Sequence, residues 1–209
     1  LIISQDPDAV FGVTSLYAVD MDGDDDLDIL VSSFFDNKIS WIENLDGQGS
    51  FGPAQSITTG LTFALFAFPA DLDNDGDMDV IGVSSSDDNV IWYENVLGGA
   101  AFNSNLVTGS LSRPQRAYAS DLDGDGDMDI LTTSSADDRI SWYENTNGQG
   151  NFSLKETIST TVNGAVSIQA ADLDNDGDQD VVCTSDFDDE IVWFENTNGL
   201  GNYGFEQII

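Results

Sequence analysis

The chain contains a nine-residue acidic segment four times, and the copies begin 50 or 51 residues apart. The segments read D-M-D-G-D-D-D-L-D from Asp20, D-L-D-N-D-G-D-M-D from Asp71, D-L-D-G-D-G-D-M-D from Asp121 and D-L-D-N-D-G-D-Q-D from Asp172. Carboxylates at alternate positions repel one another within one short turn, and a hard cation relieves that repulsion. Ca²⁺, which takes an all-oxygen shell, is the natural occupant. A fixed period of about 50 residues also indicates a repeat architecture.

The second segment shows how one ion is held. The side chains at positions 1, 3 and 5 (Asp71, Asp73 and Asp75) can converge on a single cation. Gly76 at position 6 permits the sharp turn, position 7 offers its backbone carbonyl, and Asp79 at position 9 closes the shell. This is the liganding rhythm of an EF-hand loop. Each segment is followed by a β-prone run instead of a helix, so an EF-hand proper is not predicted.

Two details of the loops carry their own expectations. The first loop has Asp25 at position 6, where the others have Gly76, Gly126 and Gly177. If that position needs a positive φ, the aspartate costs roughly 1 kcal/mol, so we expect this loop to be occupied but geometrically different. Position 8 is expected to face inward where it is apolar, at Leu27, Met78 and Met128.

The segments between the loops follow one plan in every repeat. After the loop come a short β-prone run, a polar turn, a W-x-E-N strand, a Gly-rich turn and a last strand. Four strands in about 50 residues is the size of one propeller blade; a β-solenoid is the competing repeat geometry. We predict an all-β fold, a four-bladed β-propeller domain or propeller segment over residues 1–209. Its loops lie at 20–28, 71–79, 121–129 and 172–180.

The two ends of the chain belong to the same element of the repeat. Tyr203–Ile209 matches Phe51–Ile57, and Leu1–Ile3 resembles the end of that strand. The ends are therefore expected either to meet and close a four-bladed ring or to pair with another copy in a larger ring or filament.

One tryptophan and one glutamate recur at fixed strand positions. The tryptophans are expected to form the core between blades, with sugar stacking as the alternative reading. The glutamates, on the same face, indicate a scaffold role because a single active site would break the symmetry. These residues are Trp41, Trp92, Trp142 and Trp193, with Glu43, Glu94, Glu144 and Glu195.

Charge and composition narrow the class of function. The formal net charge is −34, and the four loops hold 21 of the 39 acidic residues. The negative electrostatic field of such a chain repels nucleic acid and anionic membranes, which are therefore poor partners. No stretch approaches the ~20 apolar residues of a membrane span. There is no histidine, which excludes the usual serine or cysteine triad. Cys183, the only cysteine, is expected to be a small buried thiol.

The loops, the W-x-E-N strand and the following G-x-G-x-F turn resemble the FG-GAP/VCBS repeat family over essentially the whole chain. That resemblance implies a β-propeller with about four Ca²⁺ ions. It implies side-chain ligands at positions 1, 3, 5 and 9: Asp20, Asp22, Asp24, Asp28, Asp71, Asp73, Asp75, Asp79, Asp121, Asp123, Asp125, Asp129, Asp172, Asp174, Asp176 and Asp180. Backbone ligands would be the carbonyls of Asp26, Asp77, Asp127 and Asp178.

We therefore expect an extracellular, calcium-binding, non-enzymatic adhesion or binding module whose partner is a protein or glycan at the cell surface. One alternative is a structural subunit joined to other copies through its terminal strands. Another is a propeller lectin that binds glycans at blade junctions. The start at Leu1, with no methionine, is interpreted as a mature or excised segment of a secreted product.

Overall fold

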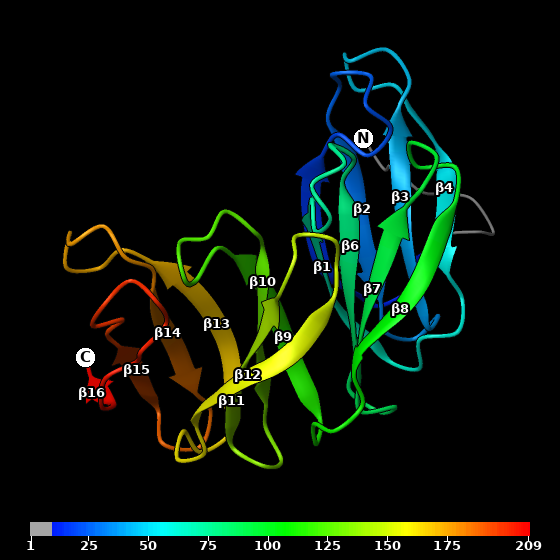
Figure 1. Ribbon diagram of the computed structural model, residues 1–209. Helices are drawn as coiled ribbons and strands as arrows, with labels where there is room; N and C mark the ends of the chain where they lie inside the picture. Colours follow the sequence, from blue (N-terminus) through cyan, green and yellow to red (C-terminus); the bar gives the residue numbers. More distant parts are fainter. Residues whose placement is uncertain (1–9) are drawn as a thin grey trace. The chain divides into compact units, whose positions relative to one another are not determined.

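The computed structural model describes residues 10–209, which form β-strands joined by turns (Figure 1). The strands make four sheets of four strands each, and in every sheet consecutive strands pair antiparallel. We call these sheets blades 1 to 4. Blade 1 comprises β1 (Val13–Val19), β2 (Asp28–Ser33), β3 (Lys38–Asn44) and β4 (Phe51–Thr58). Blade 2 comprises β5 (Ala64–Ala70), β6 (Asp79–Ser84), β7 (Asn89–Asn95) and β8 (Phe102–Thr108).

The second half of the chain repeats the same plan. Blade 3 comprises β9 (Pro114–Ser120), β10 (Asp129–Ser134), β11 (Arg139–Asn145) and β12 (Phe152–Ser159). Blade 4 comprises β13 (Ala165–Ala171), β14 (Asp180–Ser185), β15 (Glu190–Phe194) and β16 (Gln207–Ile208). The prediction of an all-β fold built from four-stranded propeller blades is confirmed.

Short polar turns join the second and third strands of each blade, as the sequence predicts. One residue in each turn has a left-handed backbone, with φ of 56° to 58°, which Asn and Asp adopt more readily than other non-glycine residues. These residues are Asn37, Asp88, Asp138 and Asp189. The Asp-Asp and Asp-Asn pairs therefore act as hairpin turns.

The described residues divide into two compact units. The first contains residues 10–71 and 75–109, and the second contains residues 72–74 and 110–209. In each unit two blades pack face to face around an apolar core. The first core centres on Leu30, Ile39 and Trp41, and the second on Leu131, Ile140 and Trp142.

Two of the repeated tryptophans, Trp41 and Trp142, belong to these two cores. Trp41, Trp92 and Trp142 are buried, as expected, and Trp193 is half-buried. In each unit the tryptophan lies directly against a glycine of the following blade, Trp41 against Gly99 and Trp142 against Gly201. A side chain at either glycine would collide with the indole ring, so glycine sets how closely the blades approach.

The C-terminal segment completes its own blade. In β16, Gln207 and Ile208 pair with Trp193 and Val192 of β15. The matching N-terminal segment, Leu1–Ile3, lies outside the described residues, so the predicted meeting of the two ends stays a prediction. Cys183 is a buried free thiol, as expected. No helix among residues 10–209 could cross a membrane.

Candidate metal centres in the acidic loops

Each acidic segment forms the connection between the first two strands of its blade. Position 6 has a positive φ in all four loops: 70° at Asp25, and 95°, 96° and 99° at Gly76, Gly126 and Gly177. Position 6 therefore needs a positive φ, as the expectation of strain at Asp25 required. Position 4 also has a positive φ, between 60° and 78°, at Gly23, Asn74, Gly124 and Asn175. Sequence reasoning missed this second constraint, although only Gly and Asn occur there.

The aspartate at position 1 organises the turn. In the first loop Asp20 Oδ1 accepts hydrogen bonds from the amides of Gly23 (2.8 Å) and Asp24 (3.2 Å), and Oδ2 accepts from Asp25 (3.0 Å). Asp121 accepts the same three bonds in the third loop. Hydrogen bonds from the main-chain amides to one carboxylate therefore define the conformation of the loop.

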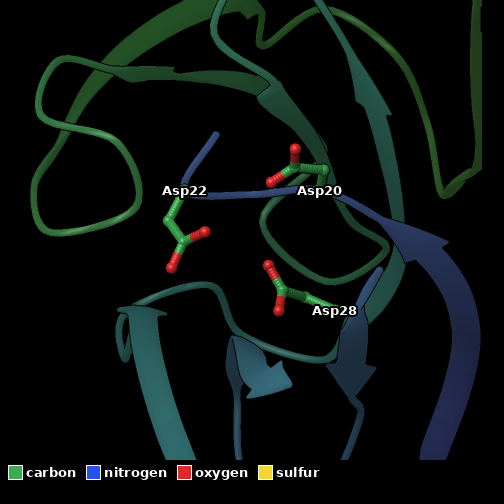
Figure 2. A group of neighbouring side chains, drawn as sticks. All are labelled: Asp20, Asp22 and Asp28. Carbon is green, nitrogen blue, oxygen red and sulfur yellow. The ribbon is translucent and has the colours of Figure 1, made fainter. Parts of the chain in front are cut away.

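The structure brings three carboxylates together in every loop, with one oxygen of each lying within 4.8 Å of the others. Figure 2 shows Asp20, Asp22 and Asp28 converging in the first loop. The remaining groups are Asp71, Asp73 and Asp79; Asp121, Asp123 and Asp125; and Asp172, Asp174 and Asp176. Positions 1 and 3 thus belong to every group, joined by position 9 in the first two loops and by position 5 in the last two.

The aspartate at position 9 has a second role that the sequence did not reveal. Asp28 is buried; its Oδ2 accepts the amide of Met21 (2.9 Å) and its Oδ1 accepts the amide of Asn44 (2.8 Å). The bond to the W-x-E-N asparagine amide recurs at 2.7 to 2.8 Å in the other blades. Position 9 therefore ties the loop to the third strand in every blade, and in the first two loops it also belongs to the carboxylate group.

Burial has an electrostatic consequence in the third loop. The pKa of Asp129 is raised to about 7, chiefly by burial, against the opposing hydrogen bonds from the amides of Asn145 and Leu122. Burial, followed by the neighbouring carboxylates Asp24 and Asp125, also raises the pKa values of Asp22 and Asp123. Without a cation, these groups are held in an environment that disfavours their charge.

Three buried oxygens show that the loops fit a cation. Asp22 Oδ1, Asp71 Oδ1 and Asp123 Oδ1 are buried and receive no hydrogen bond among the described residues. A buried carboxylate oxygen without a donor is costly unless something positive compensates it. Because the converging donors are all carboxylate oxygens, the arrangement suits a hard cation such as Ca²⁺.

Some predicted ligands lie outside these groups. At position 5 the Oδ1 atoms of Asp24 and Asp75 accept the amides of position 7, each at 2.9 Å. The side chains at position 7 approach the Gly-rich turn of a blade: Asp26 lies beside Gly47 and Asp178 beside Gly199. Position 9 of the last two loops, Asp129 and Asp180, is likewise not part of the groups.

The expectation for position 8 is wrong for Leu27 and Met128, which are exposed. Neighbouring residues in an extended chain point to opposite sides. Since position 9 points inward, Leu27 and Met128 point outward. Met78 is half-buried and packs against the core of the first unit, as expected. Position 2 supplies the apolar contact instead, through buried Met21, Leu72 and Leu122.

The asparagine of W-x-E-N is the most important residue that sequence reasoning overlooked. Asn95 Nδ2 donates to the carbonyl of Met78 in its own loop (3.2 Å) and to that of Met21 in blade 1 (3.0 Å). Its Oδ1 accepts the amide of Gly99 (2.8 Å). The signal was visible, because the same asparagine stands in all four repeats.

Comparison with known proteins gives a match to a family model described as an FG-GAP-like repeat. The model matches three overlapping stretches, residues 20–82, 71–132 and 121–183, which together contain all four acidic loops. Comparison with curated protein sequences gives no match.

Solved structures show the same fold at low identity. An Agrocybe aegerita lectin that recognises non-reducing terminal N-acetylglucosamine is 23% identical, with a TM-score of 0.65 over 92% of this chain and 51% of the lectin. The biofilm matrix protein Bap1 of V. cholerae is 19% identical, with a TM-score of 0.54 over 92% of this chain and 28% of Bap1. BBS1N, solved with ARL6DN, is 10% identical, with a TM-score of 0.65 over 97% and 58% of the two chains. The chain therefore spans about half the length of the lectin and less of Bap1.

Proposed function

Because the chain belongs to the FG-GAP-like repeat family, we propose that it is an extracellular, non-enzymatic binding module with one Ca²⁺ in the acidic loop of each blade. The observation that carries the proposal is the convergence of three carboxylates in every loop, with one buried oxygen that has no donor in each of the first three loops. Solvated acidic turns would instead direct these oxygens into water. The three aspartates of the fourth group are exposed.

The chain's own residues would hold the ion from one side of each turn. Positions 1, 3, 5 and 9 supply carboxylates, and position 7 supplies a backbone carbonyl. A bound cation would neutralise the mutual repulsion of these groups. It would fix the connection between the first two strands of the blade, so that binding free energy adds to folding free energy.

The recurring glutamates support a scaffold role and not catalysis. Three of the four are tied to the last strand of their own blade: Gln55 Nε2 donates to Glu43 (3.3 Å), Asn103 Nδ2 to Glu94 (3.2 Å), and Lys155 Nζ to Glu144 (2.8 Å). A catalytic acid pair would be expected in one blade only, with its carboxylates directed at a cavity.

The partner is proposed to be a protein or a glycan at the cell surface. One observation favours glycan binding as a second candidate. A cavity of about 340 Å³ lies between the third and fourth acidic loops, lined by Asp121, Met128, Asp178 and Gln179 among others. A glycan array tests it: binding by the calcium-loaded protein that Gln179→Ala weakens supports a lectin. An array without binding, at protein concentrations up to tens of micromolar, contradicts it.

Isothermal titration calorimetry of the chelator-stripped protein with CaCl₂ tests the calcium claim itself. We expect about four ions per chain, and about one fewer for Asp123→Asn, whose side chain belongs to the third group and carries a donor-free oxygen. The control is Asp186→Asn, which removes one exposed carboxylate outside the loops. No binding at millimolar Ca²⁺, or equal loss in both variants, would contradict the proposal.

A further inference from the structure

One aromatic position of the repeat differs in chemistry among the blades. It follows the Gly-rich turn, and it stands opposite the asparagine of W-x-E-N on the neighbouring strand. It is phenylalanine in blades 1 to 3 and tyrosine in blade 4: Phe51, Phe102, Phe152 and Tyr203. The four positions are equivalent in the fold, so Tyr203 adds a hydroxyl group at a place where the other blades have none.

Tyr203 lies in the contact between blades 3 and 4. Its ring meets the Trp142 indole edge to face, with the ring centres 6.2 Å apart and the planes at 86°. Gly201, two residues earlier, lies directly against the same indole. Asn196, which pairs with Tyr203 in the sheet, donates to the carbonyl of Leu122 in the third acidic loop (3.1 Å). The indole and the strand pairing therefore hold Tyr203 against blade 3, beside its acidic loop.

The hydroxyl of Tyr203 is enclosed near the carboxylates of that loop. The oxygen is buried and has no hydrogen-bond partner among the described residues. Burial raises the pKa of the phenol, and the next largest cause is the charge of Asp129; Asp180, Glu156 and Asp123 follow. Asp123 and Asp129 are positions 3 and 9 of the third loop. The hydroxyl therefore experiences the charges of this loop from inside the contact between the blades.

The third loop has a complementary deficit. Asp123 Oδ1 is buried and receives no hydrogen bond among residues 10–209. Asp123 also belongs to the converging group, with Asp121 and Asp125. A buried donor without an acceptor and a buried acceptor without a donor are both costly. The two deficits lie in the same contact, and an ion that draws oxygen ligands into the loop supplies a means of satisfying both.

We propose that Tyr203 is a further positioning residue of the third cation site, and that its hydroxyl, presented by blade 4, hydrogen-bonds the oxygen ligands of an ion held by the loop of blade 3. The inference rests on the proposed binding of Ca²⁺ by the acidic loops. Groups that hydrogen-bond metal ligands orient them, and their loss weakens metal binding. Two blades thus complete the third site, whereas the equivalent contact at the first loop presents Phe102, which has no hydroxyl.

The competing explanation is that only the ring of Tyr203 matters, through its packing against Trp142. Tyr203→Phe separates the two explanations because it keeps the ring and removes the hydroxyl. If the hydroxyl acts on the ion, one site should bind Ca²⁺ about ten-fold more weakly, at the low end of the effect of such partners. In EGTA the variant should melt no lower than the wild type, because the hydroxyl that it loses has no partner in the structure.

Tyr143→Phe is the matched control. The hydroxyl of Tyr143 is also buried in blade 3 without a hydrogen-bond partner among the described residues. Its counterpart in blade 2, Tyr93, is influenced by Asp87 in the turn between β6 and β7. That turn lies at the end of the blade opposite the acidic loop, because the loop joins the first two strands. Tyr143→Phe should therefore leave all Ca²⁺ affinities unchanged.

Isothermal titration calorimetry with CaCl₂ on the chelator-stripped proteins provides the measurement, with thermal melts in Ca²⁺ and in EGTA alongside. A double-variant cycle assigns the effect to the third loop. Added to Asp123→Asn, which removes that site, Tyr203→Phe should leave the titration of the remaining ions unchanged.

The possible failures are distinguishable. A wild-type protein that binds no Ca²⁺ would contradict the proposed function and this inference with it. Binding of about four ions by the wild type, with the same affinities in Tyr203→Phe, would overturn this inference alone. The same holds if Tyr143→Phe weakens binding as much, or if Tyr203→Phe melts lower by equal amounts in Ca²⁺ and in EGTA, because Tyr203 would then act through packing.

Discussion

Asn95 Nδ2 donates a hydrogen bond to the main-chain carbonyl of Met21, which lies 74 residues earlier in the acidic loop of the preceding blade. Asn196 makes the same bond to Leu122, at 3.1 Å. The asparagine thus joins its own loop, its own glycine turn and the loop of another blade. The geometry of the acidic loops and the packing of the blades are therefore coupled through one side chain.

Replacing Asn95 by alanine should leave the buried carbonyl of Met21 and the amide of Gly99 without a partner. Each unsatisfied group costs about 1–3 kcal/mol, so we expect a loss of about 3 kcal/mol in the free energy of unfolding, measured by urea denaturation in Ca²⁺. The control is Asn103→Ala, whose amide bonds Glu94 at the surface. Equal losses in the two variants would contradict the role of Asn95.

The aspartates at positions 3 and 9 should separate into two classes. Asp129→Asn places an amide donor or a poorer acceptor opposite the amides of Asn145 and Leu122. It should lower the free energy of unfolding by about 1–3 kcal/mol. The melting temperature should therefore fall both with Ca²⁺ and with EGTA. Asp123→Asn should lower it only in Ca²⁺, because this residue lacks a donor to its Oδ1 atom. Parallel behaviour of the two variants would show that position 9 is no structural anchor.

The backbone at position 6 predicts a reciprocal pair of variants. Asp25 has φ of 70° and Gly126 has φ of 96°. In EGTA, Asp25→Gly should relieve strain and stabilise the protein by up to about 1 kcal/mol, while Gly126→Asp should destabilise it by about the same amount. Chemical denaturation measures both. Destabilisation by Asp25→Gly would mean that its carboxylate matters more than its backbone.

Lys155 should weaken calcium binding in the third loop. Its Nζ lies 2.8 Å from Glu144 and 5.7 Å from the centre of the Trp142 ring. The pKa of Lys155 is raised, first by the Glu144 hydrogen bond and then by charges that include Asp123 and Asp129. Lys155→Met should therefore raise the affinity of one site about two- to five-fold, since partly exposed charges interact by under about 1 kcal/mol. Lys38→Met, in another blade, is the control, and unchanged or lower affinity would contradict this reading.

The repeating pattern was sufficient to predict the strands, the hairpins and the loop positions. Runs of Val, Ile and aromatic residues between polar turns predict the four strands of a blade. Gly76 at position 6 indicates a left-handed backbone. Burial of Trp41 and Trp142 followed from their fixed strand position. Each of these features is local to one repeat.

What the sequence did not reveal depends on contacts distant in the chain. The bond from Asn95 to Met21 connects two repeats, so no single motif displays it. The inward direction of Leu27 was wrongly predicted from its apolar side chain, whereas the buried carboxylate of Asp28 sets the direction of its neighbour.

The central claim is that cations stabilise the acidic loops, and thermal unfolding in Ca²⁺ and in excess EGTA tests it most directly. A site filled at one hundred times its Kd contributes about 2.7 kcal/mol. Several such sites should therefore raise the melting temperature by ten degrees or more in millimolar Ca²⁺. Superimposable melting curves in the two buffers would contradict the account.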